Sequence, residues 1–445
     1  MSKTSAATAP QKGRTVAIIT MFFIFAMISF VTNMAAPFGN IWGFRYEWAG
    51  MAGNLMNFLA YLFMGIPAGN MLIRYGYKKT ALIALAVGAI GLSIQLLSSV
   101  AGSDIVVIDD PVNPTYLNLF IYLLGALVCG FCVCMLNTVV NPMLNLLGGG
   151  GNKGNQLIQT GGSLNSLSGT LTPMLVGVLV GTLTKETTMT AVAPLVLTGI
   201  CIFVVAFIII SFIKIEEPQK NLSKMSYEHS PLSFRHCTLG IIAIFFYVGV
   251  EIGIPGELNA WISRMPFEGA AAVAGSLAAL YWLLMLVGRS LSSIISGKVS
   301  TRTQLIVVSS VAMVLLFVAI VLPEEITFNS PSIPAFNITS GLVPMKCLFL
   351  FLCGICTSVM WGGIFNLATE GLGKYTAKAS GLFMTMVVGG GIMPFIQDWI
   401  GRNFGYVNSY WLVLGMVAYI FFYALVGYKN VNTDIPVDDT PDAVK

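Results

Sequence analysis

The chain has 445 residues, of which 56% are hydrophobic and only 9% are charged, and its formal net charge is +4. Soluble domains carry roughly 25% charged residues, so this composition excludes a large soluble enzyme. The many apolar residues exclude a disordered chain, and the absence of a glycine repeat excludes collagen.

Long apolar segments recur along the whole chain. A helix needs roughly 20 apolar residues to cross a bilayer, and none of the segments alternates with the period of two that marks a membrane β-barrel. We therefore predict an all-α integral membrane protein with twelve transmembrane helices in two six-helix bundles. The helices are predicted at residues 15–38, 50–73, 80–101, 116–147, 157–184, 189–213, 237–263, 269–296, 303–323, 341–369, 377–400 and 406–428.

The order of these segments predicts the domain organisation. The first apolar segment is too long for a signal peptide, so we expect it to be helix 1. The interior segment 214–236 is polar and divides the helices six and six, an arrangement typical of transporters whose substrate site lies between two bundles. We expect a tail at 1–14, bundles at 15–213 and 237–428 joined by the linker 214–236, and a tail at 429–445.

The basic residues predict the orientation. Seventeen of the 23 Lys and Arg residues fall in segments on the side of the chain termini, five fall on the other side, and Arg289 lies within a helix. This bias places both termini in the cytoplasm, as in a multi-pass protein of a bacterial inner membrane. No basic patch carries interleaved aromatic residues, so we expect no nucleic-acid partner.

The cysteines and histidines do not favour a metal site. Cys353 and Cys356 form a C-x-x-C pair inside a predicted helix, but no second pair has zinc spacing, and the two histidines are in or beside the linker. We expect buried thiols, no metal and no cofactor.

Three charged residues lie inside predicted helices and away from the helix ends, whereas Asp398 and Glu370 lie near helix ends. A charge at the bilayer centre costs roughly 2.5–3.5 kcal/mol, so such residues are functional candidates. Glu251 is at the centre of helix 7, where a buried carboxyl group can take up and release a proton. We predict that it couples transport to protons, the alternative being a structural ion pair with Arg289. Glu257 is predicted to bind substrate or to lie at the outer mouth, and Arg289 to stabilise the inner gate.

Amide and aromatic side chains supply further candidates. Amides both donate and accept hydrogen bonds, which suits sugar hydroxyls, although they also join helices to one another. Aromatic rings stack on sugars, although they also anchor helices at the membrane surface. The predicted substrate-binding residues are Asn33, Asn57, Asn137, Asn141, Gln159, Asn165, Tyr247, Trp282, Trp361 and Asn366. Residues 137, 141 and 145 share one helical face.

Several motifs resemble known transporters. The segment 69–79, GNMLIRYGYKK with Arg74, resembles the helix 2–3 signature of the major facilitator superfamily, with Ile73 in place of the usual aspartate. Arg74 is expected to be part of the inner gate. FVTNMAAP at 30–37 resembles the helix 1 motif of the fucose–galactose–glucose/proton symporter family. Further similar motifs, in chain order, are IPAG (66–69), LNTVVNP (136–142), NSLSGTLTP (165–173), YVGVEIGI (247–254), EGLGKYTAKASG (370–381) and VVGGGIMP (387–394).

The chain departs from this family at three positions. The family's helix 1 aspartate falls on Ala36, its helix 4 glutamate on Asn137, and a helix 5 glutamine on Gly162. Those two carboxylates are associated in the family with sugar binding and proton coupling. We therefore expect any coupling to depend on Glu251, and the cavity to accept a larger ligand such as an N-acetylated amino sugar.

The resemblance implies a secondary transporter that imports a monosaccharide or amino sugar by alternating access, with protons as co-substrate and the lipid bilayer as its surroundings. A monomer suffices for this architecture. The alternatives are an uncoupled sugar facilitator, favoured by Ala36 and Asn137, and an exporter of amphipathic compounds, favoured by the 22 methionines. A membrane enzyme or a channel is not favoured, because catalytic motifs, pore loops and charged rings are absent from the sequence.

Overall fold

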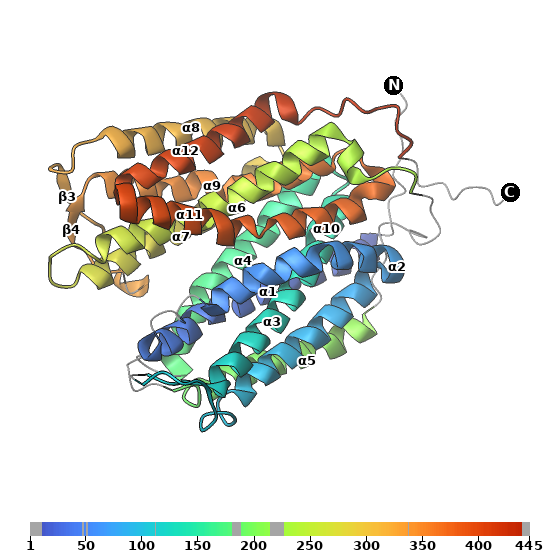
Figure 1. Cartoon of the computed structure of the whole chain (residues 1–445). Helices are drawn as coiled ribbons and strands as arrows, with labels where there is room; N and C mark the ends of the chain where they lie inside the picture. Colours follow the sequence, from blue (N-terminus) through green and yellow to red (C-terminus); the bar gives the residue numbers. More distant parts are fainter. Residues whose placement is uncertain are drawn as a thin grey trace.

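Figure 1 shows the computed structural model of the chain, which describes residues 11–46, 49, 52–111, 113–179, 188–213, 227–336 and 338–437. Most of the predicted N-terminal tail, residues 214–226 of the predicted linker, and the end of the C-terminal tail lie outside the described residues. Residues 50–51 of the predicted helix 50–73 and residues 180–184 of the predicted helix 157–184 also lie outside the described residues.

The N bundle contains five helical elements that provide six membrane crossings. They are α1 (Gln11–Arg45), α2 (Ala52–Leu97), α3 (Leu117–Leu147), α4 (Gly151–Leu179) and α5 (Ala193–Phe212). At 46 residues, α2 contains the predicted segments 50–73 and 80–101 in one element. The chain reverses at Gly76, whose φ of 80° is a left-handed conformation that glycine adopts without steric cost. The predicted loop between helices 2 and 3 is thus a turn at a single glycine.

The C bundle supplies the other six crossings. Its helices are α6 (Arg235–Ile262), α7 (Ala270–Ile295), α8 (Thr301–Val321), α9 (Lys346–Thr369), α10 (Thr376–Met386), α11 (Gly389–Phe404) and α12 (Tyr406–Phe422). Short turns flank them: η3 (Pro231–Ser233), η4 (Pro334–Phe336), η5 (Gly373–Tyr375) and the π-helical η6 (Tyr423–Gly427). The predicted helix 377–400 is interrupted between α10 and α11, immediately before the run of glycines at 389–391. Together α10 and α11 make one crossing.

Two small β-hairpins lie at one end of the molecule. In one, β1 (Val106–Ile108) pairs antiparallel with β2 (Thr115–Tyr116), and in the other β3 (Thr327–Asn329) pairs antiparallel with β4 (Leu342–Pro344). We call this the hairpin end. The opposite end, where α1 begins and η6 follows α12, is called the termini end (Figure 1).

The two bundles meet at the termini end and diverge toward the hairpin end (Figure 1). The backbones of α2 and α10 approach each other closely, because a Cβ atom on Gly69 would lie 3.0 Å from the Gly381 Cα atom and 3.1 Å from the Ala377 carbonyl oxygen. Small residues allow helix backbones to approach this closely inside a membrane. The structure is therefore closed at the termini end.

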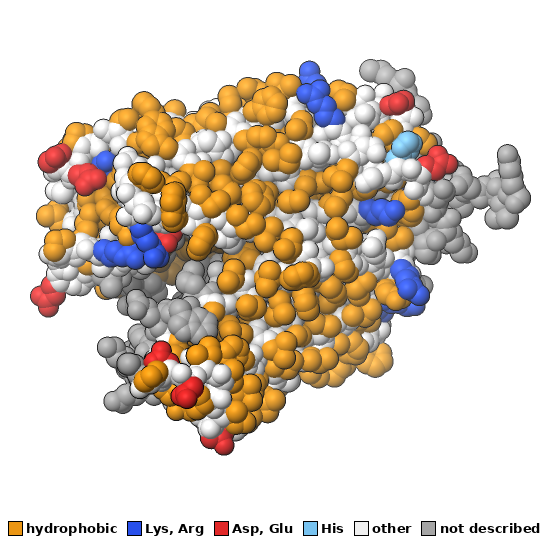
Figure 2. All heavy atoms as spheres, viewed as in Figure 1, with side chains coloured by type: hydrophobic (Ala, Val, Ile, Leu, Met, Phe, Trp, Pro, Cys, Tyr) orange, Lys and Arg blue, Asp and Glu red, His pale blue; other side chains and the backbone are white. Residues whose placement is uncertain are grey.

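The sides of the molecule are hydrophobic. Figure 2 shows apolar side chains over the lateral face between the two ends, with charged side chains mostly toward the ends. Large apolar side chains such as Phe212, Ile294 and Phe395 are exposed on different helices. Ten of the described helical segments are long and apolar enough to cross a membrane; α2 is counted once among them, and the more polar α4 is not included. A surface of this kind is suited to lipid rather than to water.

Candidate transport site

An ion pair lies between α6 and α7. The Arg289 Nη2 atom is 3.0 Å from the Glu251 Oε1 atom, and the two side chains are only 12% and 15% exposed. Two charges this far from water are tolerated when they pair with each other. Glu251, Glu257 and Asp398 are the only acidic residues in helices α1 to α12, so the N bundle helices carry no carboxyl group at all.

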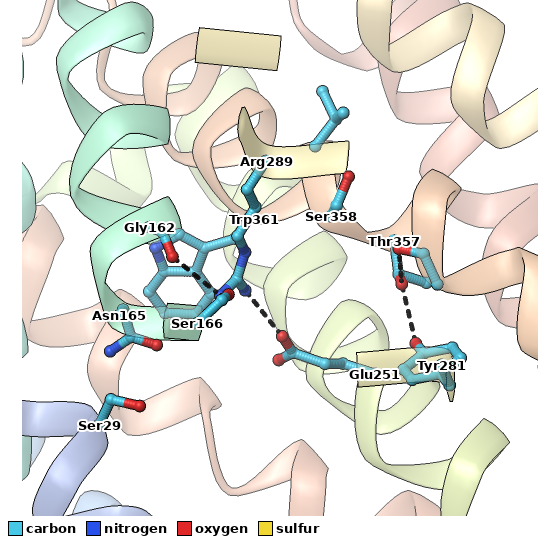
Figure 3. A network of polar contacts seen from close by, with 12 residues as sticks. Ser29, Gly162, Asn165, Ser166, Glu251, Tyr281, Arg289, Thr357, Ser358 and Trp361 are labelled. Atoms are coloured by element: carbon cyan, nitrogen blue, oxygen red, sulfur yellow. Dashed lines mark hydrogen bonds and ion pairs between the residues drawn. The ribbon is translucent and has the colours of Figure 1, made fainter. Parts of the chain in front are cut away.

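Arg289 also reaches across to the N bundle. Its Nη1 atom donates to the Ser166 hydroxyl at 2.7 Å and lies 3.5 Å from the Gly162 carbonyl oxygen, both on α4 (Figure 3). A Cβ atom on Gly162 would stand 3.4 Å from the Arg289 Cδ atom, so a longer side chain at 162 would occupy the space of the arginine. Arg289 thus connects the Glu251 carboxylate of one bundle to the backbone and a hydroxyl group of the other.

A second connection between the bundles involves Trp361. The indole nitrogen of Trp361, on α9, donates to the Asn141 Oδ1 atom on α3 at 3.0 Å. The ring of Trp361 packs against Tyr247 on α6, with 6.0 Å between ring centroids. Tyr247 lies one helical turn before Glu251. The structure therefore brings three predicted site residues, Tyr247, Trp361 and Asn141, beside the ion pair.

The amides on α3 are hydrogen-bonded in sequence. The Asn141 Nδ2 atom donates to the Asn137 carbonyl oxygen at 2.9 Å, and the Asn137 Nδ2 atom donates to the Tyr61 hydroxyl on α2 at 3.0 Å. Where the resembling family has a glutamate, this chain therefore has a neutral amide with a phenol partner. The α3 stripe can exchange hydrogen bonds with a polar ligand but carries no charge.

Nearer the termini end, predicted site residues join the two bundles directly. The Gln159 Nε2 atom donates to the Val359 carbonyl oxygen at 3.0 Å, and the Asn366 Nδ2 atom donates to the Gly151 carbonyl oxygen at 2.9 Å. Asn145, on the α3 stripe, donates to the Thr369 hydroxyl at 3.0 Å. All three amides are buried. In this conformation they close the termini end and do not face the ion pair.

Two predicted residues on α1 and α4 bond to α1. The Asn33 Nδ2 atom donates to the Ser29 carbonyl oxygen at 2.8 Å, within the same helix, and the Asn165 Nδ2 atom donates to the Phe25 carbonyl oxygen at 3.0 Å. Asn165 and Ser29 lie on the N-bundle side of the polar network in Figure 3. Both amides keep an oxygen that is free of these bonds.

Four predicted residues lie elsewhere. Asn57 lies inside the N bundle, where it lines a small cavity between α1, α2 and α3 with Gln95 and Tyr122. Trp282 is 39% exposed on α7, two helical turns from Arg289 toward the hairpin end and without a contact to the ion pair. Glu257 packs against Gly401 of α11, and Arg74 is exposed beside the Gly76 turn, over the ring of the adjacent Tyr75.

Ser166 and Thr357 were not predicted from the sequence. Ser166 accepts a hydrogen bond from Arg289, and Thr357 bonds the Tyr281 hydroxyl at 2.8 Å behind the ion pair (Figure 3). Hydroxyl residues are common in membrane helices, so only the adjacency of Ser166 to Asn165 could have indicated it. Among the described residues no group of three or more His, Cys, Asp or Glu side chains could hold a metal ion, and all eight cysteines are free thiols.

The fold and the site together define a membrane transporter built from two six-helix bundles, with polar groups of both bundles meeting between them. The chain belongs to the Major Facilitator Superfamily, whose family model matches residues 16–394. Members of this superfamily are transporters and not enzymes.

Two similar proteins have curated descriptions. A glucose/galactose transporter of Brucella abortus biovar 1 (strain 9-941) is 27% identical over 436 residues, covering 95% of this chain and 97% of that protein. A putative glucose/galactose transporter of Helicobacter pylori (strain ATCC 700392 / 26695) is 25% identical over 429 residues, covering 93% of this chain and 96% of that protein.

Two solved structures share the fold. The E. coli fucose:proton symporter FucP superposes with a TM-score of 0.73 at 17% identity, covering 92% of this chain and 98% of that one. The proton:xylose symporter XylE superposes with a TM-score of 0.69 at 10% identity, covering 94% and 97% of the two chains. At these identities the similarity establishes the architecture, and residue roles must be argued from this chain.

Proposed function

We propose that the protein imports a monosaccharide or amino sugar by alternating access and that protons drive the import through Glu251. The observation that carries this proposal is the connection from Glu251 through Arg289 to Ser166, which links the one buried carboxylate between the bundles to both of them. The names of the two similar curated proteins support a hexose-like substrate.

The side chains around the ion pair suit a polyhydroxyl ligand. Arg289 and the Trp361 indole donate hydrogen bonds, whereas Asn137 and Asn141 can both donate and accept. The adjoining rings of Trp361 and Tyr247 supply an apolar face for the C–H side of a sugar ring. We place six of the predicted substrate-binding residues in the substrate region: Asn33, Asn137, Asn141, Asn165, Tyr247 and Trp361.

A proton on Glu251 would change what Arg289 can bind. While Glu251 is ionised, its carboxylate neutralises Arg289 and accepts one of its N–H groups. Protonation removes that negative charge, and the hydroxyl groups of a sugar then provide acceptors for the freed guanidinium N–H. Substrate and proton thus stabilise the same arrangement, which is the thermodynamic requirement for symport.

We further propose that the termini end faces the cytoplasm of a bacterial cell and that the hairpin end faces the periplasm, as the distribution of Lys and Arg indicates. The structure, closed at the termini end, is then the outward-facing conformation. The two bundles would be joined by the cytoplasmic linker 214–236 and would act as a monomer.

A facilitator without coupling is the second candidate. It is favoured by one observation, the neutral Asn137–Tyr61 pair where the resembling family has a carboxylate. The two candidates differ in whether a sugar moves protons with it.

Proteoliposomes test both. Sugars that quench the tryptophan fluorescence of the purified protein are first selected from fucose, glucose, galactose, mannose and N-acetylglucosamine. For the selected sugar, we expect Glu251→Gln to retain counterflow exchange and to lose accumulation driven by a proton gradient. Glu324→Gln is the matched control, because Glu324 is an exposed carboxylate 3.9 Å from Lys346. Normal accumulation by Glu251→Gln would refute the coupling role, and no binding by any sugar would refute the substrate class.

A further inference from the structure

Two polar side chains cross between α6 and α11, away from the ion pair. On α6, Gly253 and Glu257 are one turn apart, and on α11, Gln397 and Gly401 are one turn apart. The atom nearest to a Cβ on Gly253 would be the Gln397 Oε1 atom, and the atom nearest to a Cβ on Gly401 would be the Glu257 Oε1 atom. Each polar group therefore occupies the space that a glycine leaves on the opposite helix.

Both of these oxygen atoms are buried without a hydrogen-bond donor. Glu257 is 4% exposed and Gln397 is 0% exposed, and neither Oε1 atom has a partner among the described residues. The Ser409 hydroxyl on α12 lies within hydrogen-bond reach of Glu257 and 3.5 Å from the Gln397 amide nitrogen, but it donates its own proton to the Tyr406 carbonyl oxygen. Two unpaired acceptors in a buried place are costly, and more so if one of them is charged.

The surrounding charged groups do not supply the missing donor. Arg402 pairs with Asp398 at 2.7 Å, and both lie on α11 beside Glu257. Arg264, after α6, donates to the Tyr406 hydroxyl of α12. On α12, the hydroxyl of the buried Tyr410 donates to the Ile254 carbonyl oxygen at 3.0 Å. The negative charge of Asp398 also disfavours a second ionised carboxylate nearby.

We propose that Glu257 is a second proton-binding site, located between α6, α11 and α12 of the C bundle, and that the bound proton is the donor these oxygens lack. The proton on Glu257 is donated toward the Gln397 amide oxygen, directly or through one water molecule. Asp398 is 29% exposed and Arg402 is 61% exposed, so the site has a short route to solution at the hairpin end. This site is independent of the proposed substrate and of Glu251.

The proton links the packing of α6 and α11 to pH. In the folded protein Glu257 holds a proton near neutral pH, whereas in the unfolded chain the same glutamate is exposed to water and already ionised. Stability must therefore fall as pH rises, because the unfolded state then binds fewer protons than the folded state. An ionised Glu257 would instead leave a buried charge against Gly401 and loosen the contact between the helices.

Thermal unfolding of the purified full-length protein tests this sign. We expect the wild type and Glu251→Gln to lose several degrees of Tm from mildly acidic to mildly alkaline pH. Glu257→Gln, whose amide is neutral and can donate to Gln397, should keep one Tm across the range. If Glu257→Gln showed the same decrease of Tm with rising pH as the wild type, that result would overturn the proposal. So would a loss that sodium chloride reverses and choline chloride does not, since the site would then bind a metal cation.

Infrared spectroscopy gives a direct readout that does not need Glu257→Gln to fold. In the Glu251→Gln background, we expect the C=O stretch of a protonated carboxyl group, lost as pH rises. Gln397→Leu removes the acceptor and should move that loss to lower pH. The absence of a protonated carboxyl signal, as expected if the Gln397 amide donates to an ionised Glu257, would refute the site. If the carboxyl signal of Gln397→Leu disappears at the same pH as in the Glu251→Gln background alone, the role of Gln397 is refuted.

Discussion

Replacing Gly381 by alanine tests the closure of the two bundles at the termini end. A Cβ atom at 381 would lie 2.6 Å from the Gly65 carbonyl oxygen and 2.9 Å from the Gly69 Cα atom of α2. Both are backbone atoms, which cannot turn aside as a side chain would. The added methyl group therefore fits only if α10 and α2 move apart.

The size of the effect follows from the type of contact. Forcing one carbon atom into a well-packed contact costs about 1–3 kcal/mol. Alanine also favours helix over glycine by about 1 kcal/mol, but α10 would be helical in both conformations, so this gain cancels from their equilibrium. The whole steric cost thus acts against the closed form, and the ratio of closed to open molecules should fall by about 5- to 150-fold.

Distances between spin labels report this ratio. The spin labels are attached to cysteines that replace Lys79 on the N bundle and Lys429 on the C bundle, both of which are exposed near the termini end. Cys201, the one exposed native cysteine, is replaced by serine so that it is not labelled. We expect Gly381→Ala to add a population at longer distance. Gly275→Ala on α7 is the control, because its Cβ would meet nothing within 4 Å. An unchanged distance distribution in Gly381→Ala would refute the close contact as the element that holds the bundles together.

Two further predictions concern the site. Arg289→Met leaves Glu251 as an unpaired buried charge and should destabilise the protein by about 3–5 kcal/mol. In denaturation experiments, the double variant Glu251→Gln/Arg289→Met should be more stable than Arg289→Met alone. If the two substitutions instead lower the stability additively, the pairing is contradicted. Trp361→Phe keeps a ring against Tyr247 but removes the hydrogen bond to Asn141, whose net contribution to the free energy is about 0.5–1.5 kcal/mol. Its sugar affinity, measured by calorimetry, should change by no more than about tenfold, whereas Trp361→Ala should lose binding; equal effects would contradict a stacking role.

The apolar segments located the helices well because the bilayer fixes a minimum length for every crossing. Their interruptions were harder to predict. A turn at one residue, Gly76, leaves no polar segment between two helices, and the break before Gly389 falls within a continuous apolar segment. The hairpins β1–β2 and β3–β4 are too short to show a strand period.

The site was predictable only where a residue is costly to bury. Glu251 and Arg289 are conspicuous inside helices because an unpaired charge there is expensive, and the structure contains the ion pair that the sequence offers as an alternative. Ser166 carries no such cost. The rotation of each helix about its axis depends on packing, which is why Glu257, packed against α11, could not be distinguished from residues between the bundles.

The bonds that close the termini end have a consequence for how the transporter responds to its surroundings. Apart from the Arg289 contacts, the described hydrogen bonds between the bundles join neutral groups, such as Asn145 to Thr369, Asn155 to Ser296 and Ser380 to the Thr138 carbonyl oxygen. Dissolved salt screens charges but has little effect on neutral dipoles at contact distance. The closure of the two bundles at the termini end should therefore depend little on the ionic strength of the surrounding solution.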